Sequence, residues 1–239
     1  MRHPGRWGAV TLLSATLLGP LARAEDAPLL RLGHYSTGNG LAGFVLDRQA
    51  VPAKLRFDGS EEIIALTPVR ASGNTTLLEQ DDGSALLRLD DRGGVILYTA
   101  AAREGEPAFL DQKATPLALP PGSKQAAEAA AERSRQQLRD ASGIDLPTAF
   151  ETGLDEQSPD WAQLADAATV VGVALQELAR TPLGRDAVAK KIDHVVIRTM
   201  PPVGLVLEGK TLVVMVAQDR PITGRPSSAL IRTKLEELL

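Results

Sequence analysis

The stretch Asp193–Ala217 reads DHVVIRTMPPVGLVLEGKTLVVMVA and sets the architecture of the C-terminal half. β-branched residues and leucine dominate it, and its apolar runs are continuous rather than alternating. Continuous runs are typical of strands that are buried on both faces. Glu208-Gly209, between the last two runs, has the length of a tight hairpin turn. The stretch therefore predicts buried strands that include a hairpin, and such strands need a cover.

The segment upstream predicts helices that can supply this cover. Ser158-Pro159-Asp160 combines a cap residue, a proline for the first position and an acid near the positive helix end. Apolar residues then recur at spacings of three and four, which predicts one buried side on a helix from Pro159, with Gln163 and Glu177 off that side. These apolar residues are Trp161, Leu164, Ala168, Val171, Leu175 and Leu178.

Three further helices and one irregular stretch are expected in this half. Cap residues and stop signals place the helices from Ser123 to Ser142 before Gly143, from Thr181-Pro182 to about Ile192, and after Ser227. Residues 144–156, between the helix that ends at Ser142 and the helix from Pro159, lack a clear period and predict irregular structure.

The N-terminal half has a different texture, with short strands separated by turns rich in Gly, Asn and Asp. Several strands alternate between polar and apolar residues, as at Lys54–Phe57, so we expect one face of the sheet to be buried and the other to be exposed to solvent. Their even spacing predicts an antiparallel meander that forms a small barrel or sandwich. The expected strands are Leu29–Tyr35, Ala42–Arg48, Ala53–Asp58, Ile63–Arg70, Thr75–Gln80, Ala85–Asp90 and Val95–Thr99.

Together these patterns predict an α+β protein whose β meander is followed by helices and a C-terminal antiparallel hairpin or meander. We expect a signal peptide at 1–24, a β-rich domain at 25–100, a linker at 101–122 and an α+β domain at 123–239. The linker is assigned from its prolines and Gly122.

The first residues have the layout of a secretory signal peptide. A basic start (Arg2, Arg6) precedes an uncharged run (Trp7–Ala22) and an Ala-x-Ala end at Ala24. We expect cleavage after Ala24 and a periplasmic product without a membrane span, because no later run reaches about 18 apolar residues. The chain has no cysteine, which excludes disulfides and a lipid-bearing cysteine.

Composition argues against several classes of partner. Removal of 1–24 leaves 23 basic and 30 acidic residues, a net charge of −7, which disfavours nucleic acid and anionic membrane surfaces. Aromatic residues make up only 3% of the chain. Binding sites for sugars or single-stranded nucleic acid, which depend on stacking against aromatic side chains, are therefore not expected.

No motif predicts a reaction, a cofactor or a metal. The Gly38–Gly43 stretch matches G-x-G-x-x-G, but a strand follows where a dinucleotide site needs a helix, so it predicts a turn. His34 and His194 lack partners at ligand spacing. A triad of His194 with Asp193 or Asp219 and Ser227 can be drawn, but no G-x-S-x-G supports it.

Paired acids are read here as solvated turn residues. Glu61-Glu62, Asp81-Asp82 and Asp90-Asp91 all lie at expected turns, and adjacent strand residues face opposite ways. We therefore expect no carboxylate dyad of the glycosidase type.

Two resemblances can be identified. The segments Gly43–Arg48, Lys54–Ser60 and Leu87–Val95 resemble an uncharacterised family of secreted Gram-negative proteins, a domain of unknown function, and the segments Gly184–Val188 and Leu207–Leu212 are similar to other secreted proteins of unknown function. That resemblance covers most of the mature chain and implies a compartment and an architecture, but no activity.

A second resemblance covers residues 30–99. Tyr35–Gly40, Ala71–Gly73 and Asp82-Gly83 are similar to the barrel of C-type lysozyme inhibitors. That family inserts a Ser-Gly-x-x-Tyr loop into the lysozyme cleft; Ser72 and Gly73 match it, and Thr76 stands at the tyrosine position. The resemblance implies Ser72 and Gly73 as binding residues.

We therefore expect a non-enzymatic periplasmic protein that binds or interacts with another component, with an envelope protein as one candidate partner. A lysozyme-inhibitor-like protein and a hydrolase that uses His194 are the alternatives.

Overall fold

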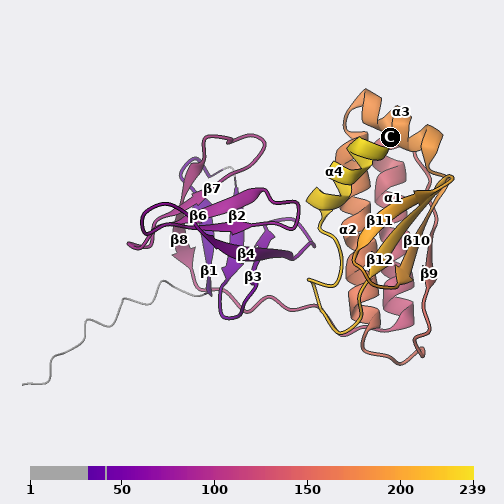
Figure 1. Cartoon of the computed structure of the whole chain (residues 1–239), viewed down its shortest axis with the longest axis horizontal. Coiled ribbons are helices and arrows are strands. Elements are labelled where there is room, and N and C mark those ends of the chain that lie inside the picture. Colours follow the sequence, from indigo (N-terminus) through magenta and orange to yellow (C-terminus); the bar gives the residue numbers. More distant parts are fainter. Residues whose placement is uncertain (1–31, 41) are drawn as a thin grey trace, which may run out of the picture.

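A computed structural model describes residues 32–40 and 42–239, which form two parts side by side (Figure 1). The first part is a β-barrel, and the second combines a four-stranded sheet with helices. The expected signal peptide at 1–24 and the cleavage position after Ala24 lie outside the described residues. The α+β class and the antiparallel N-terminal meander are confirmed.

Eight antiparallel strands close into the barrel in sequence order, with β8 beside β1. The meander closes because alternate side chains share one apolar interior, in which Phe44, Leu46, Leu55 and Leu87 are fully buried. The strands are β1 (Leu32–Thr37), β2 (Gly43–Asp47), β3 (Ala53–Phe57), β4 (Ile64–Arg70), β5 (Thr76–Glu79), β6 (Ala85–Leu89), β7 (Val95–Leu97) and β8 (Glu106–Gln112).

β8 lies inside the stretch that the sequence suggests is a linker. It pairs with β7 through Ala108 opposite Val95, and with β1 through Phe109 opposite Ser36. Its sequence, EPAFLDQ, carries a proline and three polar residues, so it lacks the pattern of a buried strand. Only its position between two strand edges that need partners makes it a strand, so the linker prediction is wrong for Glu106–Gln112.

The second part contains α1 (Lys124–Ser142), α2 (Trp161–Ala179), α3 (Pro182–Lys191) and α4 (Ser228–Leu238). Three caps agree with the sequence: the hydroxyls of Ser123, Thr181 and Ser227 accept backbone N–H groups at the starts of α1, α3 and α4. Gly143 ends α1 in the left-handed conformation at φ 76°, as expected of a C-terminal glycine.

α2 starts later and is buried more widely than the sequence predicts. It begins at Trp161 rather than Pro159, because Ser158 and Pro159 lie in a preceding turn. The five large apolar residues of the predicted side are all buried. Gln163, expected off that side, is buried too, and its Nε2 donates to the Ala217 carbonyl at 2.5 Å.

The sheet has the order β11-β12-β10-β9, formed by β9 (Thr148–Glu151), β10 (His194–Thr199), β11 (Gly204–Glu208) and β12 (Thr211–Val216). The predicted hairpin is present as β11–β12. β10, however, is parallel to β12 and β9 rather than part of a meander. β9 falls in the stretch expected to be irregular, so that expectation is wrong for Thr148–Glu151.

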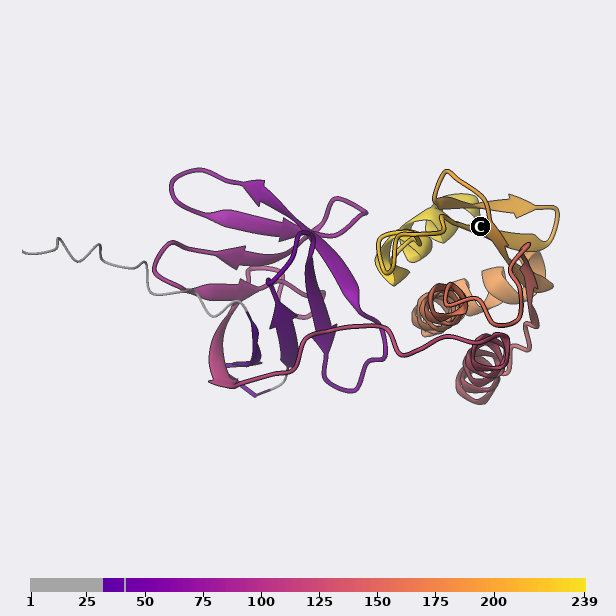
Figure 2. The same ribbon diagram turned by 90° about the horizontal axis from the view of Figure 1, so that it is seen from below.

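Helices α1, α2 and α4 lie on the same side of this sheet (Figure 2). They share one core with alternate residues of β10 and β12, such as Val195, Ile197, Leu212 and Val214. α2 is the central helix, because it packs against α1, α3 and α4 as well as against β10. The continuous apolar runs are explained by both faces of this sheet. The helices cover one face, and on the other face the small β-branched residues Val196 and Val213 are also buried.

Candidate functional site

A buried charge cluster joins the barrel to the α/β part. Arg225, which lies before α4, places its Nε 2.7 Å from Oδ2 of Asp166 on α2 and its Nη1 3.6 Å from Oε1 of Glu62 on the barrel. Its Nη2 also donates to the Ile63 carbonyl at 2.9 Å. All three charged side chains are at most 5% exposed. A charge this deeply buried requires such partners, so the cluster fixes the two parts against each other.

The N-terminus of α4 is capped by carboxylates from the barrel. Glu62 accepts the backbone N–H of Ser228 at 3.0 Å and its hydroxyl at 2.5 Å, and Asp81 accepts the N–H of Ser227 at 2.8 Å and its hydroxyl. The first N–H groups of a helix lack partners within it and carry partial positive charge. The barrel thus supplies the anions that this helix end favours.

Burial raises the pKa of the Glu62 carboxyl, while the Arg225 charge and the Ser228 hydrogen bonds oppose that rise. Burial likewise raises the pKa of Asp166 against the same guanidinium. Two carboxyls therefore share one cation in a buried junction. The expectation that the paired acids are solvated turn residues is wrong for Glu62, because the turn is covered by α4.

A groove of about 820 Å³ runs beside this junction and is lined from both parts of the molecule. The barrel contributes the apolar Phe57, Ile64 and Leu86, and α2 and α4 contribute Val173 and Ala229. Its rim carries Arg103, from the β7–β8 loop, and Arg232 on α4, and its lining also includes the carboxylates of Glu62, Asp82 and Glu177.

The two rim arginines differ in their pairing. Arg232 lies 3.6 Å from Glu177, whereas no ion pair joins Arg103 to another residue within 32–40 and 42–239. The groove therefore combines an apolar floor with a guanidinium that is available to an acidic group. Its size is within the range of small-molecule sites, which often lie between domains.

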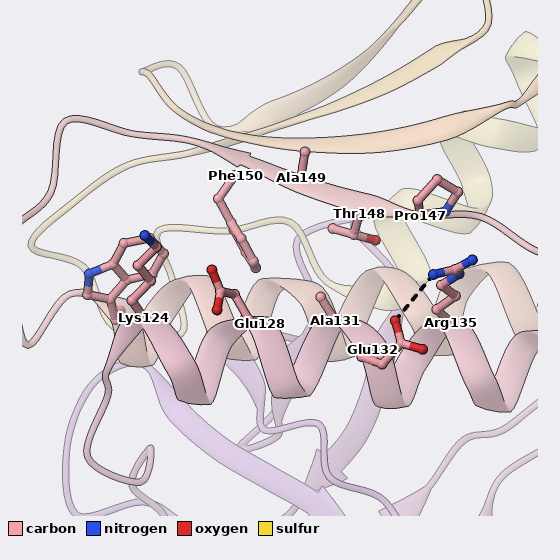
Figure 3. Close-up of a pocket in the computed structure, with 10 residues that line it drawn as sticks. Lys124, Glu128, Ala131, Glu132, Arg135, Pro147, Thr148, Ala149 and Phe150 are labelled. Carbon is pink, nitrogen blue, oxygen red and sulfur yellow. Dashed lines mark hydrogen bonds and ion pairs between the residues drawn. The ribbon is translucent and has the colours of Figure 1, made fainter. Parts of the chain in front are cut away.

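A second, smaller cavity of about 260 Å³ lies between α1 and β9 (Figure 3). Figure 3 shows the Phe150 ring pointing from the strand toward the helix, with Ala131 of α1 facing the strand. Phe150 and Trp161 pack edge to face with ring centroids 5.8 Å apart and form one wall. Charged side chains of α1 form the other: Lys124, Glu128, Glu132 and Arg135.

His34 on β1 bridges two carboxylates on the surface of the barrel. Its Nδ1 is 2.7 Å from Oδ1 of Asp111, and its Nε2 is 2.9 Å from Oδ2 of Asp58. The hydrogen bond to Asp111, then that to Asp58, raises the pKa of His34. Gly43 is needed beside it, because an added Cβ would lie 2.1 Å from Oδ2 of Asp58. This arrangement favours the protonated form of His34 between the two carboxylates.

The structure does not bring together the residues of the drawn triad. Nε2 of His194 is 2.9 Å from Oγ1 of Thr211. The Ser227 hydroxyl donates to Asp81, and Asp193 pairs with Lys210 at 3.4 Å. His194 therefore faces a hydroxyl on the neighbouring strand.

The other predicted features lie in barrel loops. The Gly38–Gly43 stretch joins β1 to β2, so strands rather than a helix flank it, as expected of a turn. Ser72 and Gly73 are exposed in the β4–β5 loop, with Gly73 at φ 68°. They lie apart from both grooves.

Within 32–40 and 42–239, no group of three or more His, Asp or Glu side chains is placed to hold a metal ion. Over the same residues, no helix has both the length and the apolar content needed to cross a membrane.

Sequence reasoning missed the Arg225 junction and the cavity between α1 and β9. Arg225 and Glu62 are 163 positions apart, and no periodicity signals their pairing. A single signal was present: an arginine and a glutamate in segments rich in apolar residues, Arg225 before a helix cap and Glu62 before the apolar Ile63-Ile64.

Comparison with known proteins gives a family but no activity. Neither curated proteins nor solved structures gave a match. A family model, described as a domain of unknown function (DUF4908), matches residues 13–235. Since that match spans nearly the whole sequence, the chain belongs to the family of the domain of unknown function DUF4908.

Proposed function

We propose that this protein is a non-enzymatic binding protein of the periplasm, and that its ligand occupies the groove between the barrel and the α/β part. The groove itself carries this proposal, since its two walls come from different parts that the Arg225 cluster holds at a fixed position. A preformed site of this kind binds without the cost of first ordering its walls.

The lining favours an elongated apolar ligand with one acidic group. Phe57, Ile64 and Leu86 offer apolar contact, and Arg103 offers a charged donor. A charge-assisted hydrogen bond of this kind contributes about 1.5–3 kcal/mol.

The dye 1-anilinonaphthalene-8-sulfonate is an apolar anion and serves as a defined probe. We expect it to bind the mature protein with increased fluorescence, and Arg103→Glu to weaken binding by about tenfold or more, from the loss of one charged contact. Arg92→Glu is the matched control, because Arg92 is exposed at the opposite end of the β6–β7 hairpin. Equal affinity of the two variants would rule out this groove.

The non-enzymatic assignment is supported by the separation of His194, Ser227 and Asp193, each of which has another partner. A hydrolase that uses His194 would lose its activity in His194→Ala. Turnover of ester, peptide or glycoside substrates that disappears in this variant would contradict the proposal.

The periplasmic location rests on the basic start, the apolar run and the Ala-x-Ala end of residues 1–24. We predict that the mature chain begins at Glu25. N-terminal sequencing of protein from the periplasmic fraction measures this directly, and an intact Met1 in the cytosolic fraction would contradict it.

A lysozyme-inhibitor-like activity is a second candidate, favoured by the exposed position of Ser72 and Gly73 at a hairpin end of a closed barrel. Such an inhibitor would slow a C-type lysozyme in a turnover assay, and Ser72→Arg would relieve the effect. Unchanged turnover with a micromolar excess of the protein would exclude this candidate.

A further inference from the structure

We propose that the free edge of β9 and the adjoining face of α1 form a docking site for an extended basic segment of another protein. The segment would add to the sheet as a fifth strand beside β9. This site is separate from the groove between the two parts, so it does not depend on the function proposed for that groove.

The backbone of β9 presents an open edge. β9 is the last strand of the sheet, and among the described residues no strand pairs with its outer side. The Val195 N–H donates to the Pro147 carbonyl at 2.9 Å, so Pro147 and every second residue after it face β10. The N–H and C=O groups of Thr148 and Phe150 therefore face outward. An extended chain can pair with such groups.

The face of α1 beside this edge has the spacing needed to meet a strand. Lys124, Glu128, Ala131, Glu132 and Arg135 form one stripe along the cavity (Figure 3). Side chains four residues apart on a helix are separated by about 6 Å along its axis, and alternate strand residues by about 6.6–6.8 Å. Alternate side chains of an added strand would thus meet successive turns of α1.

The charge of the α1 stripe favours a basic segment at this edge. The stripe and its ion-pair partners contain the cations Lys124 and Arg135 and four carboxylates, a net charge of −2, which becomes −1 when Arg139, 4.0 Å from Asp145, is included; the carboxylates are Glu128, Glu132, Asp145 and Glu156. Lys124 and Arg135 are already paired, at 3.1 Å and 2.5 Å, whereas no ion pair joins Glu128 to another described residue. A lysine or arginine of the incoming strand would form an ion pair with the Glu128 carboxylate.

The same charge disfavours a second copy of this chain as the occupant. Pairing of β9 with β9 would bring two acidic stripes together, which costs energy through like-charge repulsion. A partner whose extended segment alternates basic and apolar residues avoids this cost and places its apolar residues near Ala131 and Phe150.

The test uses the mature full-length protein and a labelled, acetylated and amidated six-residue peptide of alternating lysine and valine. Fluorescence anisotropy measures its binding. We expect Glu128→Lys to weaken binding by about tenfold or more, and Asp140→Lys to change it by less than about twofold. Asp140 is exposed on the same helix outside the stripe, and both changes alter the net charge equally. Equal weakening in both variants would overturn the proposal.

A backbone test separates strand addition from simple charge attraction. In an added strand only every second N–H faces β9. Of two peptides that are N-methylated at alternate sets of residues, we therefore expect one to lose binding and the other to retain it. Retention by both, or loss by both, would overturn strand addition. Sedimentation that shows the unaltered protein as a dimer that the peptide dissociates would assign the edge to a second copy instead.

Discussion

At the scale of single residues, acidic side chains decide how the barrel is held together and attached. Asp58 and Asp111 hold His34 between them, and Glu62 and Asp81 cap α4. These acids occur in similar polar turns or strand ends, yet their exposed fractions differ widely: the Glu62 side chain is 4% exposed and the Asp58 side chain 58%. What each one does follows from the element that lies against it.

His34 makes the stability of the barrel depend on pH. Because its pKa is raised in the folded state, its pairing contributes fully below its ordinary value of about 6.5, and this contribution is lost as pH rises through the raised value. We predict that the free energy of unfolding falls between about pH 6 and about pH 9, and that His34→Gln removes this part of the fall. Urea melts of the unaltered protein and of His34→Gln at these two pH values measure the free energy of unfolding.

His194→Gln is the control for this titration. His194 is exposed and faces a Thr211 hydroxyl rather than a carboxylate. A pH dependence that persists unchanged in His34→Gln but disappears in His194→Gln would show that the barrel cation is not responsible.

At the scale of elements, α2 organises the α/β part. Its residues pack against α1, α3, α4 and the sheet, so most of its circumference is buried rather than one side. Where α1 crosses it, Gly172 faces Ser134, and an added Cβ would lie 2.5 Å from the Ser134 Cβ. The helices approach this closely because both residues are small.

Three alanine substitutions on α2 probe this packing. Leu175→Ala should cost about 2–5 kcal/mol as a large-to-small change in a core. Gln163→Ala should cost about 1–3 kcal/mol, because it removes a buried side chain together with its hydrogen bond to the half-buried Ala217 carbonyl. Glu177→Ala should cost less than about 1 kcal/mol, because its pair with Arg232 is only partly buried and remains in contact with solvent. Denaturant melts rank the three, and a cost for Glu177→Ala as large as that of Leu175→Ala would contradict this packing.

The crossing of α1 and α2 gives a second prediction. Gly→Ala normally favours a helix by about 1 kcal/mol. At Gly172 we expect the opposite, a loss of about 1–3 kcal/mol from overpacking against Ser134. Ser134→Gly combined with Gly172→Ala should recover part of the loss, since it removes the clashing atoms. Additive costs in the double variant, measured by thermal melts, would mean that the two residues do not meet.

At the scale of the whole molecule, the Arg225 cluster and a small apolar cluster join the two parts. Ile63 of the barrel, Leu117 of the connecting segment and Ile222 before α4 form the apolar cluster. A β unit of this size buries only about 60% of its unfolded surface by itself, so contact with the second part adds to its stability.

We predict that the protein unfolds in a single transition and that Arg225→Leu costs about 3–5 kcal/mol, because it leaves Glu62 and Asp166 buried without their cation. Calorimetry of the variant should resolve two transitions, one for each part. Arg232→Leu, which removes a guanidinium that is 40% exposed, should cost less than about 1 kcal/mol and leave one transition. If Arg225→Leu unfolds in a single transition at the same temperature as the unaltered protein, the cluster does not hold the two parts together.

The sequence by itself determined the features that depend on neighbouring residues. Three of the four predicted helix caps, the stop signals, seven strands of the barrel, the β11–β12 hairpin and the buried side of α2 follow from local periodicity and turn chemistry. The tertiary structure decided the rest: β8 closes the barrel, β10 pairs in parallel with β12, and Glu62, Asp166 and Arg225 meet in one cluster. These features join residues that are distant along the chain. Their partners are chosen by which strand edges and charges remain unsatisfied once the local elements have packed, and that depends on the whole fold.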